Sequence, residues 1–132
     1  MKRLSPREEK VMRIMWRIGE GVVRDVIEQM PPPPPPYNTV SSIIRILEEK
    51  GYLSHKAYGR THVYFPIVKE EDFRQNSLQR LVSHYFSGSP SNLVSFMVEH
   101  EALSEAEIQR IRELLDRVEA NQQSETGEEE YP

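Results

Sequence analysis

The sequence predicts a mainly α-helical protein with one small β-hairpin, and three observations support this fold class. Apolar residues recur at helical spacing in several separate stretches of the 132 residues. Capping residues and helix breakers, such as Ser5-Pro6-Arg7-Glu8 and Gly51, mark where helices begin and end. Two short runs rich in aromatic and β-branched residues follow Gly51. We therefore expect a winged helix-turn-helix module at the N-terminus and a helical region after it.

The composition limits the classes of function. The chain has no cysteine, which excludes a disulfide, a thiolate nucleophile and a Cys-based metal site. No apolar run approaches the roughly 18 residues of a membrane-spanning helix, and the first residues lack the apolar core of a signal peptide, so we expect a cytoplasmic protein. None of the four histidines has the surroundings of a catalytic base or a metal ligand. We therefore predict no enzyme, no metal and no cofactor.

The net charge of -4 conceals an uneven distribution of charge. Through Pro66 the chain carries 11 basic and 7 acidic residues, whereas the remainder carries 6 basic and 14 acidic residues. A basic N-terminal module joined to an acidic region is typical of a DNA-binding domain attached to a second functional part.

Two helices are expected before a run of prolines. Ser5 and Glu8 form a capping box with Pro6 at the first helical position, and Gly19-Glu20-Gly21 ends this helix. Its buried face consists of Val11, Met12, Ile14, Met15 and Ile18, and Trp16 either joins this core or packs on the hairpin. The second helix, Val22 to Met30, has apolar residues at i, i+3, i+4 and i+7.

Six consecutive prolines, Pro31 to Pro36, cannot be helical and should form a polyproline II segment of about 3.1 Å per residue. We interpret the run as the enlarged turn of a helix-turn-helix, which fixes the angle at which the chain approaches the next helix. The alternative is a ligand for an SH3-type partner domain.

The stretch from Tyr37 to Gly51 is an amphipathic helix. Asn38 or Thr39 is expected to cap its N-terminus, and Gly51 to end it in a left-handed conformation. One face is apolar and is expected to be buried: Val40, Ile43, Ile44 and Leu47. The opposite face is small and polar.

The runs Tyr52 to Ala57 and Thr61 to Phe65 are expected to be the two strands of a wing, joined by Tyr58-Gly59-Arg60. A polar helix beside a basic hairpin suits a helix that enters the DNA major groove and a wing that contacts phosphates, while the alternative is a surface helix with a capping hairpin. Arg45 would pair with a guanine, and Lys56 and Arg60 would hold phosphates. The predicted DNA contacts are Asn38, Thr39, Ser41, Ser42, Arg45, Lys56 and Arg60.

The remaining helices are expected to form a dimerisation region. Glu70 to Phe86 and Asn92 to His100 have helical patterns, and a last helix, capped by Ser104 and Glu107, runs to about Ala120. Helices this short and apolar have too little core of their own, so we expect them to pack against a second copy. The predicted contacts are Leu93, Val94, Met97, Ile108, Ile111, Leu115 and Val118. The predicted boundaries are 1–69 for the winged helix, 70–120 for dimerisation, and 121–132 for an acidic, disordered tail.

Three stretches together resemble one family of regulators: LSPREEKVMRIMW, NTVSSIIRILEEKGYLSHKAYGRTHVYFP and LVSFMVEHEALSEAEIQRIRELL. In order and spacing they are similar to the BlaI/MecI/CopY family of winged-helix repressors, over nearly all of residues 4 to 118. The resemblance implies a homodimer that binds a palindromic operator. It also implies that repression is relieved when a membrane metallopeptidase sensor triggers cleavage of the repressor.

Two features depart from the family pattern. The position of the family's Asn-Phe cleavage bond is occupied here by Phe96-Met97, and the cysteine motif of the copper-responsive members is absent. Nothing in the sequence marks a ligand pocket, so we expect induction by proteolysis or partner binding. Because Arg45 is the only basic residue on the polar face of its helix, a protein-protein interaction module without sequence-specific DNA binding is the alternative function. The operator sequence, the regulated genes and the inducing signal are not encoded in any motif.

Overall fold

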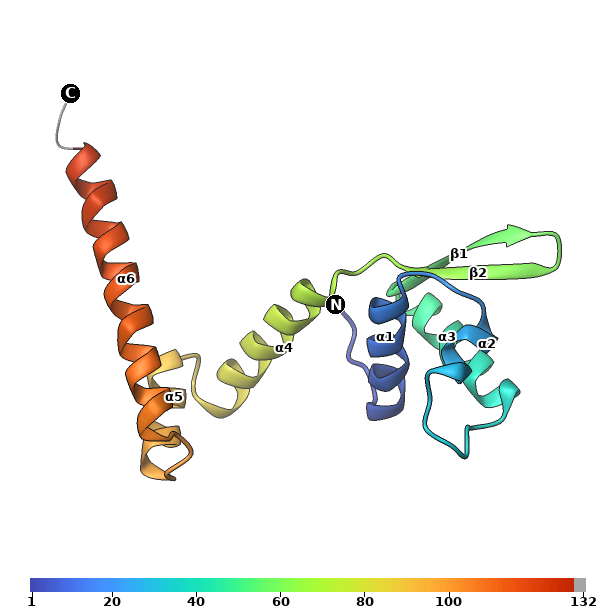
Figure 1. The fold of residues 1–132 in the computed structure, drawn as a ribbon, viewed down its shortest axis with the longest axis horizontal. Helices are drawn as coiled ribbons and strands as arrows, with labels where there is room; N and C mark the ends of the chain where they lie inside the picture. The colour runs from blue at the N-terminus through green and yellow to red at the C-terminus, as the bar shows by residue number, and fades with distance from the viewer. Residues whose placement is uncertain (130–132) are drawn as a thin grey trace. The chain divides into compact units, whose positions relative to one another are not determined.

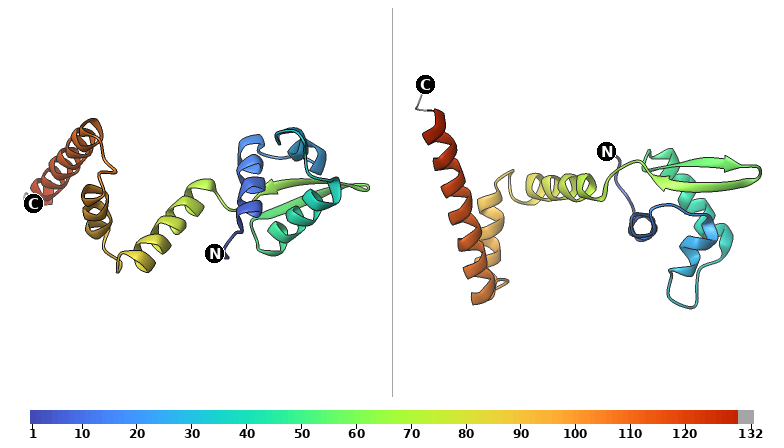
Figure 2. Two further views of the ribbon diagram at one scale, coloured as in Figure 1. Left: turned by 90° about the horizontal axis from the view of Figure 1, so that it is seen from below. Right: turned by 45° about the horizontal axis from the view of Figure 1, so that its top comes forward.

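The computed structural model describes residues 1–129, with side chains up to residue 124, and divides into two units, Met1–Arg80 and Leu81–Pro132. The first unit contains three helices, a two-stranded antiparallel sheet and most of a fourth helix. Figure 1 shows the hairpin above the three helices, and Figures 1 and 2 show its turn projecting beyond them. The predicted class, a mainly helical winged helix-turn-helix followed by helices, is confirmed.

Helix α1, Pro6–Ile18, begins and ends where the sequence predicts. Ser5 Oγ accepts a hydrogen bond from Glu8 N, and Glu8 Oε2 accepts one from Ser5 N, both at 3.2 Å, so the predicted capping box is present. The helix ends at Gly19, which has φ +83°.

Helix α2, Val23–Glu28, is shorter than the predicted span of Val22 to Met30. Asp25 accepts a hydrogen bond from Val22 N at 2.9 Å and fixes the start of the helix. The proline run between α2 and α3 is neither helix nor strand, and it bends at Pro32 and Pro33.

Helix α3, Tyr37–Glu49, begins before the predicted caps. Pro36 is the N-cap, and its carbonyl accepts hydrogen bonds from Thr39 N and Val40 N. Asn38 and Thr39 therefore lie in the first turn, because the fixed backbone of the preceding proline already suits a helix start.

The C-terminus of α3 forms a Schellman motif. Gly51 N donates to Glu48 O, Tyr52 N donates to Leu47 O, and Gly51 has φ +83°. The left-handed glycine was predicted from the sequence, and the motif turns the chain directly into the wing.

The wing consists of β1, Leu53–Tyr58, and β2, Thr61–Pro66. Tyr58 pairs with Thr61, so only Gly59 and Arg60 form the connection, one residue fewer than predicted. Gly59 has φ +63°, which suits the first position of a tight type II′ turn. Gly21 exchanges two backbone hydrogen bonds with Tyr64 and thereby attaches the segment before α2 to the wing.

One core joins α1, α2, α3 and the wing. Trp16 packs on its edge, where its ring lies 5.4 Å from that of Phe73 and its Nε1 donates to Val68 O at 2.9 Å. Helix α4 is thus tied to α1 at its start. The buried apolar members are Val11, Met12, Ile14, Met15, Val23, Val26, Val40, Ile44, Leu47, Tyr52, Leu53 and Tyr64.

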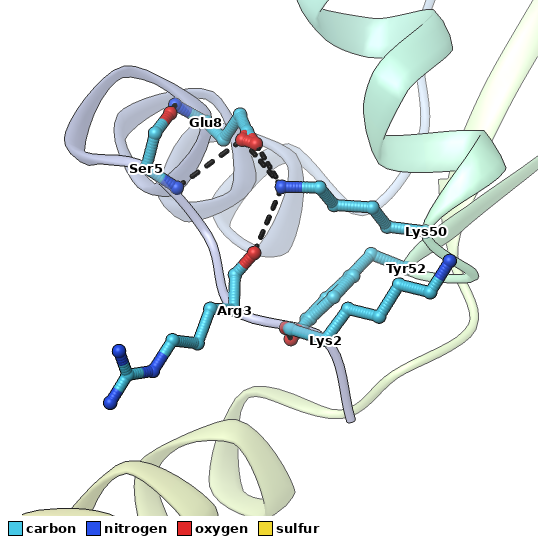
Figure 3. A network of polar contacts seen from close by, with 6 residues as sticks. All are labelled: Lys2, Arg3, Ser5, Glu8, Lys50 and Tyr52. Carbon is cyan, nitrogen blue, oxygen red and sulfur yellow. Dashed lines mark hydrogen bonds and ion pairs between the residues drawn. The ribbon is translucent and has the colours of Figure 1, made fainter.

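A polar network links the N-terminal residues, the start of α1 and the end of α3 (Figure 3). Lys50 Nζ forms an ion pair with the buried Glu8 carboxylate and donates to Arg3 O at 2.9 Å. The hydroxyl of the buried Tyr52 donates to Lys2 O. The start of α1, the end of α3 and the N-terminal residues are therefore joined by side chains from distant parts of the sequence.

The later helices are α4, Glu70–Tyr85, α5, Pro90–Glu99, and α6, Glu105–Glu129. Helix α6 continues past the predicted end near Ala120 and ends at Glu129. Residues 121–129 are therefore helical, where the sequence predicted disorder. Glutamine and glutamate have high helix propensity, and no proline interrupts them before Pro132. The rest of the predicted tail, residues 130–132, lies outside the described residues. No helix in the described part of the chain is long and apolar enough to cross a membrane.

Candidate nucleic-acid interface

Helix α3 presents a polar face to solvent. Val40, Ile44 and Leu47 are fully buried, and this fixes the rotation of the helix about its axis. Four of the predicted contacts lie on the other side, where Ser41 is half-buried and three are exposed: Asn38, Ser42 and Arg45. Ile46, 39% exposed, adds an apolar group to this side, of the kind that contacts thymine methyl groups in the major groove.

The N-terminal half of α3 is the half suited to a polyanion. No side chain caps its first turn, so the N–H groups of Tyr37 and Asn38 and the positive end of the helix dipole face outward. The opposite end carries Glu48 and Glu49. Electrostatics therefore favours an orientation in which the N-terminal turns of α3 approach the nucleic acid.

The two predicted wing contacts occupy different places. Neighbouring residues of a strand point to opposite faces, and the face that packs toward α3 carries His55, His62 and Tyr64. Lys56 lies on the other face, with its Nζ 5.7 Å from the ring centre of Phe65. Arg60 lies in the turn, at the projecting end of the hairpin.

A hollow of about 440 Å³ lies between α2, α3 and the wing. Arg24, Arg45 and Arg60 line it from these three elements, together with Ser41 and the aromatic side chain of Tyr37, which is 51% exposed. Three arginines thus line one concave surface, and a guanidinium group is suited to anionic oxygens because it offers a planar set of N–H donors.

The hollow also has titratable neighbours. Burial raises the pKa of the Tyr64 hydroxyl, and the charge of Glu48 raises it further while Arg45 acts in the opposite direction. Tyr64 is thus a neutral hydrogen-bonding group beside the arginines. His55 Nδ1 lies 2.6 Å from Glu48 Oε2, and the rings of His55 and His62 stack with centres 4.2 Å apart. The described residues contain no group of three or more His, Asp or Glu side chains that could hold a metal ion.

The match to known proteins covers nearly the whole chain. The penicillinase repressor family model matches residues 4–117. This chain belongs to the penicillinase repressor family. The resemblance predicted from the sequence is therefore confirmed, and the family is one of transcriptional repressors rather than enzymes.

Individual members of the penicillinase repressor family are moderately similar. The methicillin resistance regulatory protein MecI of Staphylococcus aureus is 28% identical over 115 residues, which cover 86% of this chain and 94% of MecI. The penicillinase repressor of Bacillus licheniformis is 25% identical over 114 residues, covering 86% of this chain and 89% of that protein. The solved DNA-binding domain of the repressor BlaI is 29% identical, covers 55% of this chain and 93% of that domain, and has a TM-score of 0.47.

The sequence did not predict several members of the hollow in this penicillinase repressor family protein, among them Arg24, Tyr37 and His62. Arg24 lies on α2, whose sequence pattern predicts only a buried face, and the fold alone brings it into the same hollow as Arg45. Tyr37 was named only as the start of a helix, although an aromatic residue at an exposed first turn was a usable signal. His62 lies in the second predicted strand of the wing, and only the fold places it in the hollow with the arginines.

Proposed function

We propose that this chain is a homodimeric repressor that places α3 in the major groove of a palindromic operator, and that a membrane metallopeptidase sensor relieves the repression. The observation that carries the DNA-binding part is the convergence of Arg24, Arg45 and Arg60 on one hollow beside the N-terminal turns of α3. Family membership supports transcriptional repression as the biological role.

In this proposal the predicted residues divide into two kinds of contact. Arg45 pairs with a guanine, and Asn38, Ser41 and Ser42 hydrogen-bond base edges or nearby phosphates. Arg24 and Arg60 hold phosphates on either side of the groove, and Lys56 reaches the backbone from the other face of the wing. Thr39, half-buried in the first turn, contributes through its hydroxyl, because its backbone N–H already donates to Pro36 O.

The exposed apolar residues of the second unit support the homodimer. In one copy of the chain Leu115 is 57% exposed and Val118 is 50% exposed, and Val94 is 44% exposed. The other predicted contacts are half-buried: Leu93, Met97, Ile108 and Ile111. A second copy would remove this apolar surface from water.

Relief by proteolysis rests on the family resemblance. The bond that replaces the family's cleavage site, Phe96-Met97, lies inside α5, with Phe96 exposed. A protease binds an extended substrate, so cleavage here requires local opening of α5. An intact chain throughout induction in cells would contradict this part of the proposal without touching the DNA-binding part.

Single substitutions test the DNA contacts through the salt dependence of binding to an operator duplex. Arg45→Ala should cost about 1 to 3 kcal/mol per half-site and relax the preference at one base pair. Lys56→Ala should weaken binding to all sequences alike and reduce the salt slope by about one unit per site. Arg13→Ala is the matched control, because it removes one positive charge from an exposed part of α1 outside the hollow.

If Arg45→Ala left both affinity and sequence preference unchanged, α3 would not be the recognition helix. The protein-protein interaction module would then be the better explanation of the same surface. The presence of Arg24 and Arg60 beside Arg45 favours DNA, because the arginines supply the charge that α3 lacks when it is considered alone.

A further inference from the structure

A second hollow, of about 520 Å³, lies between α1 and the proline run, away from the hollow with the three arginines. Its apolar lining includes Ile14, Met30 and Ile43. Pro31, Pro33 and Pro35 form part of its wall, and prolines give a rigid wall because their φ angles are fixed. Its volume lies within the range of about 300 to 1,000 Å³ that is usual for small-molecule sites.

The remaining wall of this hollow is basic. Four cations of α1 line it: Arg7, Lys10, Arg13 and Arg17. Two of them are already engaged, since Arg13 is paired with Glu9 at 2.7 Å and Arg17 donates to Gln29 Oε1 at 3.5 Å.

The other two cations are available. Arg7 and Lys10 are exposed, and neither takes part in an ion pair between described residues. They are three positions apart on α1 and so lie on the same face, where their like charges repel. An anion bound between them would remove this repulsion and gain hydrogen bonds from both.

We propose that this hollow binds a small organic acid, whose carboxylate pairs with Arg7 and Lys10 and whose apolar ring or chain packs on Ile14, Met30 and Ile43. The two parts of the lining, the cations and the apolar residues, together favour this class of ligand. A bare anion would leave the apolar lining uncovered, and a neutral apolar molecule would desolvate the two cations without pairing them. A sugar-phosphate backbone has no apolar body that fits such a lining.

The sequence showed no sign of this site because its parts come from three segments. The cations repeat on the solvent face of α1, where a charge run is usually only solvated. Ile14 and Ile43 belong to the helical stripes of α1 and α3, Met30 lies just after α2, and the proline run predicts only an enlarged turn. The fold places all of them around one space.

The test is a titration of the full chain with 2-naphthoate, followed by the methyl NMR signals of Ile14, Met30 and Ile43. These three methyl signals should shift together and saturate. Two comparison probes separate the contributions: 2-naphthylmethanol has the ring without the charge, and acetate has the charge without the ring. Because charge and apolar packing must act together, both should bind at least about tenfold more weakly.

The matched variants are Arg7→Gln/Lys10→Gln and Lys2→Gln/Arg3→Gln, which change the net charge equally. Exposed ion pairs are individually weak, so loss of both cations in the hollow should weaken binding of naphthoate by about tenfold. Lys2 and Arg3 make their recorded contacts through backbone carbonyls. Because salt screens distant charges, their substitution should change the dissociation constant by less than about twofold.

Three results would overturn the proposal. They are an absence of saturable shifts at the three methyl groups, equal binding of naphthoate and naphthylmethanol, and equal effects of the two double variants. Shifts of the same methyl groups by duplex DNA but not by naphthoate would instead make Arg7 and Lys10 phosphate contacts. The titration contains no operator, so failure of the repressor function would leave its result unaffected.

Discussion

Replacing Lys50 by methionine should destabilise the N-terminal unit more than replacing Glu8 by glutamine, although both changes break the same ion pair. The Lys50 side chain is 26% exposed, whereas that of Glu8 is 8% exposed. When Glu8 is replaced, Lys50 can turn toward water or keep its hydrogen bond to Arg3 O. When Lys50 is replaced, the buried Glu8 carboxylate cannot reach water and keeps only the hydrogen bond from Ser5 N.

These geometries set the expected free energies of unfolding. Removing one partner of a fully buried ion pair costs about 3 to 5 kcal/mol. The partial exposure of Lys50 and the remaining hydrogen bond from Ser5 reduce this free-energy cost, so we expect Lys50→Met to cost about 2 to 3 kcal/mol. Glutamine preserves the capping box and loses one charge-assisted bond, so we expect Glu8→Gln to cost about 1 kcal/mol.

Urea unfolding followed by Trp16 fluorescence measures this difference. Trp16 is the only tryptophan of the chain and packs in the N-terminal unit, where its indole donates to Val68 O. Its emission therefore reports unfolding of that unit and is insensitive to dissociation elsewhere. The reasoning would be refuted if Glu8→Gln cost as much as Lys50→Met, or if both stayed within about 0.5 kcal/mol of wild type, as ordinary surface substitutions do.

The same variants have a defined pH dependence. Burial raises the pKa of the Glu8 carboxyl, but hydrogen bonds from Lys50 and Ser5 and the charge of Lys50 outweigh burial and lower the pKa from its ordinary 4.5. A lowered folded-state pKa means that the contribution is present above that ordinary value and is lost as the pH falls through the folded pKa. The stability difference between wild type and Glu8→Gln should therefore shrink below about pH 4.5.

Three further predictions concern local structure and assembly. Gly51→Ala should cost about 1 to 2 kcal/mol in the same urea assay, because alanine is strained in a left-handed conformation although there is space for its Cβ. Tyr52→Phe should cost about 1 kcal/mol through loss of the hydrogen bond to Lys2 O, as measured by the same fluorescence transition. Ile111→Asp/Leu115→Asp should give monomers with folded wings in sedimentation velocity, whereas a wild type that sediments as a monomer at micromolar concentration would contradict the proposed dimer.

The fold was largely predictable because its signals are local. The Ser5–Glu8 capping box, the helical spacing of Val40, Ile44 and Leu47, and Gly51 each act within a few residues, and each was predicted correctly. The errors arose where several local solutions compete. The N-cap of α3 is Pro36 rather than Asn38 or Thr39, and the connection of the hairpin is one residue shorter than predicted.

The candidate sites were less predictable because each is assembled from separate segments. Arg45 and Arg60 were predicted from the polar face of a helix and from a hairpin turn. Arg24 had no local signal, since only the packing of α2 against α3 and the wing brings it to the same hollow. The ion pair between Glu8 and Lys50 was missed for the same reason, because these residues meet only when the end of α3 reaches the start of α1.

The two units differ in how completely they bury their apolar side chains, and this difference connects dimer formation to DNA binding. The first unit buries Met12, Val26 and Ile44 completely and needs no partner for its core. The second leaves Leu115 and Val118 half exposed or more in one copy. In the proposed dimer, substitutions on α6 would therefore weaken operator binding without any change in α3, because a monomer contacts one half-site only and loses the contribution of the other.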